Sequence, residues 1–474
     1  MALSKKLSVN KSILKERLGI EKSFDIIGRE FMAGEKEAYL VFVDGFAKDN
    51  IMFWILETLQ SLNKEEITAH TVATLLQRKI GYIEVDTFDE IETLVLFVLS
   101  GTVALFLDGE TKGIIIDARQ YPVRGPEEPD LERVTRGARD GLVETIIFNT
   151  ALIRRRIRDP KLIFEIQNVG KRSRSDVVVG YIEDLADPLL LDNVRKKLKE
   201  IDVDALVMAE KTLEELLIKK KWYNPLPQAK FTERPDVAAA HLLEGHIAII
   251  VDTSPSVMLL PVTIFHFTQH AEDYYQNPTV GTYIRWIRFL GMLSAFLIIP
   301  LWLLVVLNPE YLPDSLEFLG PKKVGNIPLF IQFLALEVGF DLLRIASIHT
   351  PNTLSTSLGI IGALILSEVA IKVGWFVPET VLYIALAGIG TFATPSLEFA
   401  MAIRIFRLLL LILTGLFNIY GFIAGICIIL LIVFTTKSFD GKRFTWPLVP
   451  FDPKPLSHIL FRKPIPQIKQ NGKR

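Results

Sequence analysis

The chain has one cysteine among its 474 residues, Cys427, so it cannot form an intramolecular disulfide and has no cysteine cluster for zinc. It also lacks a Walker A phosphate-binding loop and the GxSxG, HExxH and CxxC motifs. These absences argue against an energised transporter and a common hydrolase, and we expect no enzyme activity, no cofactor and no metal. The net charge is only −1, which gives nucleic acid no electrostatic reason to bind.

Two long runs without any charged residue are present instead, at 289–307 and 408–434. At 1.5 Å per residue, each is long enough as a helix to cross a hydrocarbon core of about 30 Å. Almost everything before Arg288 is charged and typical of a water-soluble α/β protein. The sequence therefore predicts an aqueous region joined to a small membrane bundle.

Strand and turn patterns divide the aqueous part into two small α/β subdomains, 36–125 and 126–265, after a charged arm at 1–35. Residues 101–119, GTVALFLDGETKGIIIDAR, hold two apolar strands with Asp108-Gly109 in the turn. A second hairpin is expected at 246–264, HIAIIVDTSPSVMLLPVTI. The segment 266–287 is aromatic and amphipathic, which suits an interfacial elbow before the first span.

The membrane domain is expected at 288–435. We predict an all-α bundle of about four transmembrane helices, with a re-entrant or interfacial helix at 327–347 that carries Glu337, Asp341 and Arg344. The last run is one tilted helix or breaks near Gly421. The four predicted spans are 288–307, 354–373, 378–395 and 406–435.

The orientation follows from the basic tail, 436–474, which holds nine Lys and Arg residues and two Asp. Excess positive charge stays cytoplasmic, and the N-terminus has no apolar core of signal-peptide length. We therefore expect a multi-pass protein of the cell membrane with both termini in the cytoplasm and an even number of crossings. This places Lys372 on the inner side, whereas Arg404 and Arg407 precede the last span on the outer side, against the rule.

Glu368 lies within the predicted span 354–373, where an ionisable group is costly and commonly faces a cavity, water or a partner. At 100° per residue it shares a stripe with three other residues, and small residues that allow close helix packing lie on the other side. Such a stripe is typical of a pore lining. The alternative is an ion pair with Lys372 at the headgroup level. The pore-lining candidates are Ser357, Ile361, Leu364 and Glu368.

Two other clusters have alternative interpretations. Arg154, Arg155 and Arg158 are able to grip phosphates, to lie on a salt-bridged surface helix, or to contact acidic residues of another subunit, which we favour. With Glu337, Asp341 and Arg344, they are the candidate subunit contacts. His266 and His270 are spaced for a metal on one helix face, but an ordinary interfacial helix is the better interpretation.

Several ordered motifs from about residue 100 onward resemble the A subunits of bacterial spore germination receptors, the GerA family. They include LVETIIFNTALIRRRI, VGKRSRSDVVVGYIEDLADP, NPLPQAKFTERPD, EVGFDLLRIASIHTPNTLSTSLGIIGALIL and TFATPSLEFAMAIRIFRLLL. The tail PLVPFDPKPLSHILFRKPIP looks most like the stage V sporulation AF branch of that family.

The resemblance implies a two-part cytoplasmic domain and a membrane domain in the spore inner membrane. It also implies a ring of subunits that conducts ions, with the pore-lining helix at roughly 354–373. We therefore expect a cyclic homo-oligomer that conducts monovalent cations across the lipid bilayer together with other germination proteins of that membrane. The alternative is a non-conducting scaffold that docks other germination or dipicolinate-channel proteins.

Overall fold

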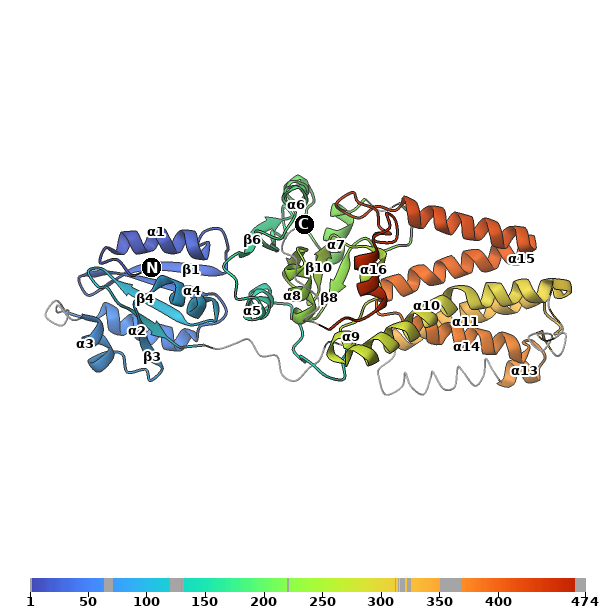
Figure 1. The fold of residues 1–474 in the computed structure, drawn as a ribbon, viewed down its shortest axis with the longest axis horizontal. Coiled ribbons are helices and arrows are strands. Elements are labelled where there is room, and N and C mark those ends of the chain that lie inside the picture. The colour runs from blue at the N-terminus through green and yellow to red at the C-terminus, as the bar shows by residue number, and fades with distance from the viewer. Residues whose placement is uncertain are drawn as a thin grey trace. The chain divides into compact units, whose positions relative to one another are not determined.

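The computed structural model divides the chain into two units. The α/β unit takes in Met1–Lys219 and Ala229–Pro261, and the helical unit takes in Lys220–Gln228 and Val262–Gln467. Each unit is described by itself (Figure 1). The structure describes residues 2–63, 71–119, 129, 132–219, 221–311, 313, 315, 320–321, 325–349 and 368–464.

The α/β unit holds two five-stranded antiparallel sheets with the same topology. The first has the strand order β1-β2-β4-β5-β3 and the second the order β6-β7-β9-β10-β8. The strands of the first are β1 (Ile26–Ala33), β2 (Lys36–Val43), β3 (Val85–Phe88), β4 (Val103–Leu107) and β5 (Gly113–Ile116). Those of the second are β6 (Leu162–Val169), β7 (Ser175–Ile182), β8 (Lys230–Thr232), β9 (Ile247–Val251) and β10 (Val257–Leu260).

The helices repeat in the same way. Each sheet is built from two strands, two helices, one strand, one helix and two strands in chain order. The unit is therefore an internal structural duplication, which we did not recognise in the sequence. The helices of the first half are α2 (Asp49–Gln60), α3 (Thr71–Arg78) and α4 (Ile91–Leu99), and those of the second are α6 (Pro188–Glu200), α7 (Ala209–Leu217) and α8 (Pro235–Leu243).

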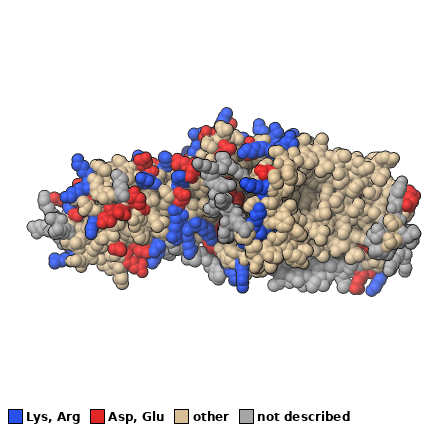
Figure 2. Space-filling view, in the orientation of Figure 1, with Lys and Arg blue, Asp and Glu red and all other residues tan. Residues whose placement is uncertain are grey.

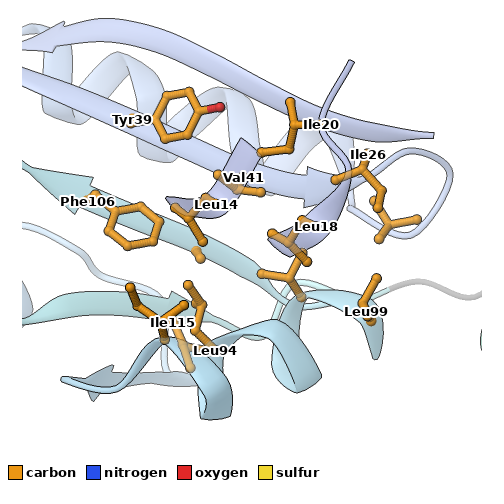
Figure 3. Packing of buried hydrophobic residues seen from close by; sticks show 14 of the residues in the cluster. Leu14, Leu18, Ile20, Ile26, Tyr39, Val41, Leu94, Leu99, Phe106 and Ile115 are labelled. Carbon is orange, nitrogen blue, oxygen red and sulfur yellow. The ribbon is translucent and has the colours of Figure 1, made fainter. Parts of the chain in front are cut away.

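The first sheet is buried on both faces because successive side chains of a strand point to opposite sides. On one face, Leu14 of α1 (Leu7–Leu18) packs with Val41, Leu94 and Phe106, as Figure 3 shows. On the other face, helices α2 and α3 cover the sheet. The segment expected as a charged arm, 1–35, thus contributes both α1 and the edge strand β1 to the first subdomain.

The second sheet is covered by α8 and by α5 (Ile146–Arg156), the helix that carries the arginine cluster. Ile153 of α5 and Leu242 of α8 are fully buried against Val178 and Ile250 of the central strands. Both hairpins expected from the sequence are present, β4–β5 and β9–β10.

The helical unit begins with the short helix α9 (Glu272–Tyr275) and the long helix α10 (Pro278–Leu307). Trp302 of α10 packs on Phe333 and Tyr383, and Gly291 lies against Gly390, so the helix that carries Tyr383 and Gly390 runs antiparallel to α10. The remaining helices are α11 (Leu329–His349), α13 (Ala370–Lys372), α14 (Pro378–Phe392), α15 (Leu397–Thr435) and α16 (Pro453–Leu460).

Helix α15 is two helices joined at Asn418, whose φ of 52° and ψ of −133° are not helical. Asparagine tolerates positive φ better than most residues. A side chain at Gly421 would collide with the carbonyl oxygen of Leu413, so the two segments approach closely next to Asn418, where Figure 1 shows α15 turning back on itself. The apolar run is therefore a helical hairpin, and the break expected near Gly421 lies three residues earlier.

The hairpin corrects the expected side of Arg404 and Arg407. Phe267 stacks on Phe399 and contacts Phe444, so α15 begins and the tail starts at the same end of the helical unit. Arg404 and Arg407, near the start of α15, therefore belong to the side of the tail and no longer oppose the positive-inside rule. The outer side follows only if 406–435 crosses once; with the break that the sequence allows near Gly421, both arginines lie on the side of the tail.

Glu368 and Lys372 lie at the opposite end of the helical unit from the tail. Val369 and Ala370 line a pocket with Ile327 and Gln332, at the start of α11. The last part of α10 lies at the same end, because Trp302 packs on Phe333 near the start of α11. Asn308, just after α10, exchanges side-chain hydrogen bonds of 2.5 and 2.9 Å with Asn418, so the turn of α15 is at this end and the tail is at the other. Lys372 was expected on the same side as the basic tail, and the structure corrects this.

Two helices among the described residues, Pro278–Leu307 and Leu397–Thr435, are long and apolar enough to cross a membrane, and Pro378–Phe392 is a shorter apolar helix. Helix α11, expected as re-entrant or interfacial, is a continuous helix of 21 residues packed on α10, α14 and α15. Most of the predicted span 354–373 lies outside the described residues.

Candidate functional site: a buried charge cluster in the helical unit

The outside of the helical unit is apolar, and charged groups are inside it. Large apolar side chains such as Leu290, Leu342 and Ile423 are exposed, and Figure 2 shows a broad surface of the unit without charged residues. By contrast, Glu337, Arg404 and Arg407 are each at most 3 % exposed. Ionisable groups within membrane helices are costly and rare, and they mark functional sites more often than ordinary packing.

The cluster joins α11 to the first segment of α15. Arg407 places Nε 2.7 Å and Nη2 2.9 Å from the carboxylate oxygens of Glu337. Arg404 donates from Nη2 to the Glu337 carboxylate at 3.1 Å and to its backbone carbonyl at 2.8 Å. Arg404 Nη1 lies 2.6 Å from Asp341 Oδ1, so one arginine holds two carboxylates.

The spacing of these residues explains how they meet. Glu337 and Asp341 are four apart on α11, and Arg404 and Arg407 are three apart on α15, so each pair occupies one face of its helix. Arg344 lies one turn beyond Asp341 at 3.9 Å and completes a cluster of three guanidinium groups and two carboxylates. The remaining Nη1 of Arg407 donates to the backbone carbonyl of Ala295 in α10 at 2.7 Å, which ties in a third helix.

A second buried cluster lies where α10 begins. Asp273 of α9 is fully buried and accepts two hydrogen bonds of 2.8 Å from the two Nη atoms of Arg288. Arg285 reaches the same carboxylate at 3.3 Å from Nε. This clamp fixes the elbow expected at 266–287 by charge pairing as well as by aromatic side chains.

Of the pore-lining candidates, only Glu368 is among the described residues; Ser357, Ile361 and Leu364 are not. The side chain of Glu368 is 61 % exposed in the single chain, and its carboxylate lies 3.7 Å from Lys372 Nζ. The ion pair considered as the alternative to a pore role is therefore present in the chain. An exposed carboxylate on a membrane bundle also leaves room for contact with a second copy.

The subunit-contact candidates divide into two groups. Arg154 is fully buried and donates to Asp25 at 3.0 and 3.1 Å and to Ser23 at 3.3 Å, so its guanidinium joins the two subdomains of its own chain instead of facing another subunit. Arg155 and Arg158 are exposed on the surface, and their role as contacts stays a prediction. Glu337 and Asp341 are bound within the chain as described above.

Arg404 and Arg407 are the residues that sequence reasoning missed. They were treated as a difficulty for the topology because they precede an apolar run. The sequence does contain an indication of this pairing. Two arginines three residues apart lie on one apolar helix, and two acids four residues apart lie on another. Charges of opposite sign on two apolar helices predict that the charges pair inside the bundle and do not lie separately on its surface.

The histidine pair has ordinary structural roles. His266 Nδ1 lies 2.9 Å from the backbone nitrogen and the hydroxyl of Thr263, and His270 Nδ1 accepts from the backbone of Glu272 at 3.2 Å. Across the described part of the chain, no group of three or more His, Cys, Asp or Glu residues is placed to hold a metal ion.

Comparison with known proteins shows where this architecture occurs. A family described as "Bacillus/Clostridium GerA spore germination protein" matches residues 12–473. Stage V sporulation protein AF of Bacillus subtilis (strain 168) is 44 % identical over 97 % of this chain and 93 % of its own length. The uncharacterized membrane protein YfkQ of the same organism is 31 % identical, with 93 % and 86 % covered.

One solved structure is similar to the N-terminal part. It is the N-terminal domain of the A subunit of the Bacillus megaterium spore germinant receptor GerK3, 27 % identical, covering 55 % of this chain and 96 % of that one with a TM-score of 0.43.

Proposed function

The chain belongs to the GerA family of spore germination proteins, and we propose that it is the membrane subunit of a spore germination complex, in which several copies form a cation channel. In this proposal the copies form a cyclic ring in the spore inner membrane, with both termini in the cytoplasm. Monovalent cations pass between the copies during germination. The path is lined by the segment 354–373, with Glu368 at one end of it.

The observation that carries the proposal is the filled interior of the helical unit. Two apolar clusters and the paired charges occupy the space between its described helices. The two apolar clusters between the described helices leave no polar lining for a hydrated cation, so in this proposal the path runs between copies. Closed rings are the usual symmetry for head-to-tail assemblies, and an odd or even number of subunits is equally compatible.

The charge cluster gives this channel a connection to the rest of the chain. Helix α11 ends at His349, directly before the proposed pore segment, and Glu337 and Asp341 fasten it to α15. A movement that widens the pore would have to carry α11 along or exchange its arginine partners. We therefore assign the cluster a positioning role for the pore segment.

The test is cation flux through liposomes that contain the purified full-length protein, with and without its membrane partners. We expect Leu364→Ala to raise the flux by widening an apolar constriction, and Glu368→Gln to reduce cation preference. Leu416→Ala, an exposed position on α15, is the matched control and should leave the flux unchanged. Protein that stays monomeric or dimeric and conducts nothing under all these conditions would instead support the non-conducting scaffold.

A further inference from the structure

The C-terminal segment 453–463 folds back across the beginning of α10. Arg285 Nη1 donates hydrogen bonds of 2.8 Å to the backbone carbonyls of His458 and Ile459. Trp286 Nε1 donates to the carbonyl of Leu460 at 2.9 Å, and the backbone nitrogen of Arg462 donates to Thr282 Oγ1 at 3.1 Å. These contacts fix the position of α16 relative to the helix that carries the first apolar run.

The fixed segment leaves apolar side chains exposed. Phe461 is 46 % exposed and packs edge-on against Trp286, which is itself half exposed, with ring centroids 5.4 Å apart. On α10, Tyr283 and Leu290 continue this exposed apolar surface on either side of Trp286. The surface of the segment is therefore continuous with an exposed apolar side of α10, just before the charge-free run 289–307 begins.

The same segment presents positive charge, and the carboxylate next to it, Asp452, caps α16 by accepting a hydrogen bond of 3.2 Å from the backbone nitrogen of Lys454. Lys454, in the first turn of α16, is exposed. Lys463 follows the helix and folds back onto that turn, with its Nζ 2.9 Å from Ser457 Oγ, which itself donates to the backbone carbonyl of Lys454 at 2.8 Å. Residues 453–463 contain no Asp or Glu.

Burial, and then the positive charge of Lys463, lower the pKa of His458. Arg462, the other cation of the segment, is only 9 % exposed and donates to the backbone carbonyl of Tyr274 at 3.0 Å, so the two lysines carry the accessible positive charge.

We propose that Lys454 and Lys463 bind the headgroup of an anionic phospholipid, while Phe461 and Trp286 contact its acyl chains near the glycerol level. The occupant is a lipid because the cationic face is continuous with an apolar surface already directed toward the bilayer, which a soluble anion would leave uncovered. Basic residues next to a membrane surface attract anionic lipid. Aromatic side chains at the interface fix how deep the segment lies in the bilayer. This site does not depend on whether the protein conducts ions.

The site would have a structural consequence for the membrane unit. The segment that binds the headgroup is joined to Arg285, which also contacts the buried Asp273 together with Arg288. A bound lipid would hold α16 against the beginning of α10 and so stabilise the clamp at that end. Anionic lipid should therefore stabilise the full-length protein more than zwitterionic lipid does.

The test uses full-length protein in nanodiscs of phosphatidylcholine with or without phosphatidylglycerol, and native mass spectrometry to count retained lipids. Lys454→Gln/Lys463→Gln should lower the preference for phosphatidylglycerol by about fivefold for each lysine removed. Lys437→Gln/Arg443→Gln removes the same charge from the same tail and is the matched control, which should retain most of the preference. An equal loss in both double variants, or no loss in either, would overturn the proposal.

Two further measurements identify the source of the anion. Inorganic phosphate added at millimolar concentration should not displace phosphatidylglycerol, because it cannot occupy the apolar part of the site. Phe461→Ala should weaken lipid retention while leaving both lysines in place. Displacement by phosphate, or unchanged lipid retention in Phe461→Ala, would show that a soluble anion site had been mistaken for a lipid site.

Discussion

The two units bury the same kind of ion pair inside opposite exteriors. In the α/β unit, Arg154 and Asp25 are paired in an interior of apolar side chains, and the charged residues lie outside. In the helical unit, Arg404 and Arg407 hold Glu337 inside, and the apolar residues lie outside. A buried arginine–carboxylate pair shows only that charges away from water need partners, and it occurs in both units. The exposed side chains show whether water or lipid surrounds each unit.

The largest expected effect comes from removing the acid shared by two arginines. Glu337→Ala leaves Arg407 without its carboxylate and Arg404 with only Asp341, and an uncompensated buried charge costs about 3–5 kcal/mol. We expect a marked loss of thermal stability in detergent and poor accumulation in the membrane. Glu310→Ala, at an exposed position, is the control and should unfold like the wild type. If the two variants had the same thermal unfolding midpoint, the cluster would contribute no stability.

The corresponding change in the α/β unit sharpens the comparison. Asp25→Ala should destabilise that unit by about 3 kcal/mol, toward the lower end of the range for a broken buried pair. The effect is smaller than for Glu337 because only one guanidinium loses its carboxylate, and Arg154 keeps Ser23 and the carbonyl of Asp159 as acceptors. Asp202→Ala breaks an exposed pair with Lys171 and should cost less than about 1 kcal/mol by urea unfolding. A similar loss of unfolding free energy in Asp25→Ala and Asp202→Ala would contradict the distinction between buried and exposed ion pairs.

Much of the α/β unit could be predicted from local patterns. The hairpin β4–β5 is marked by two apolar strands around Asp108-Gly109, and β9–β10 by apolar runs around a polar turn. Its internal duplication was missed because identical topology does not require similar residues, only apolar side chains on both faces of each sheet. Strand β1 was missed for a related reason: as an edge strand, its exposed positions include charged residues such as Arg29 and Glu30.

The membrane unit was harder to predict because apolar composition shows that a run can cross a bilayer but not whether it crosses once or twice. The run 408–434 contains the turn residue Asn418 and the small Gly421 and Gly425, which allow close packing of the two segments. These signals are weak beside an uninterrupted apolar sequence. The side of Arg404 depended on that count. The side of Lys372 depended instead on treating 327–347 as re-entrant, whereas α11 is a continuous helix of 21 residues.

Placing a lysine on the surface of each unit tests whether that surface faces lipid or water. Ile428→Lys, near the middle of the second segment of α15, should reduce membrane insertion by about 2.5–3.5 kcal/mol, the cost of a lysine at the centre of a membrane helix. Ile83→Lys, at a position 94 % exposed in the α/β unit, should have no measurable effect because that surface already faces water. Carbonate extraction of membranes measures both. Full retention of the Ile428→Lys protein would argue that this surface faces protein or water instead of lipid.

The smallest expected effect is a pH dependence confined to the water-facing surface. Burial raises the pKa of Glu165, but hydrogen bonds from Arg195 at 2.9 Å and Tyr181 at 2.6 Å outweigh it and leave the pKa below 4.5. A carboxyl with a lowered folded pKa adds stability above its unfolded pKa and loses it as pH falls through the folded value. Because Glu165 is about one-third exposed, this contribution should not exceed about 1 kcal/mol. Glu165→Gln should therefore unfold in less urea than the wild type at pH 7, with the difference shrinking below pH 4.5, and a difference that grew on acidification would show the opposite sign.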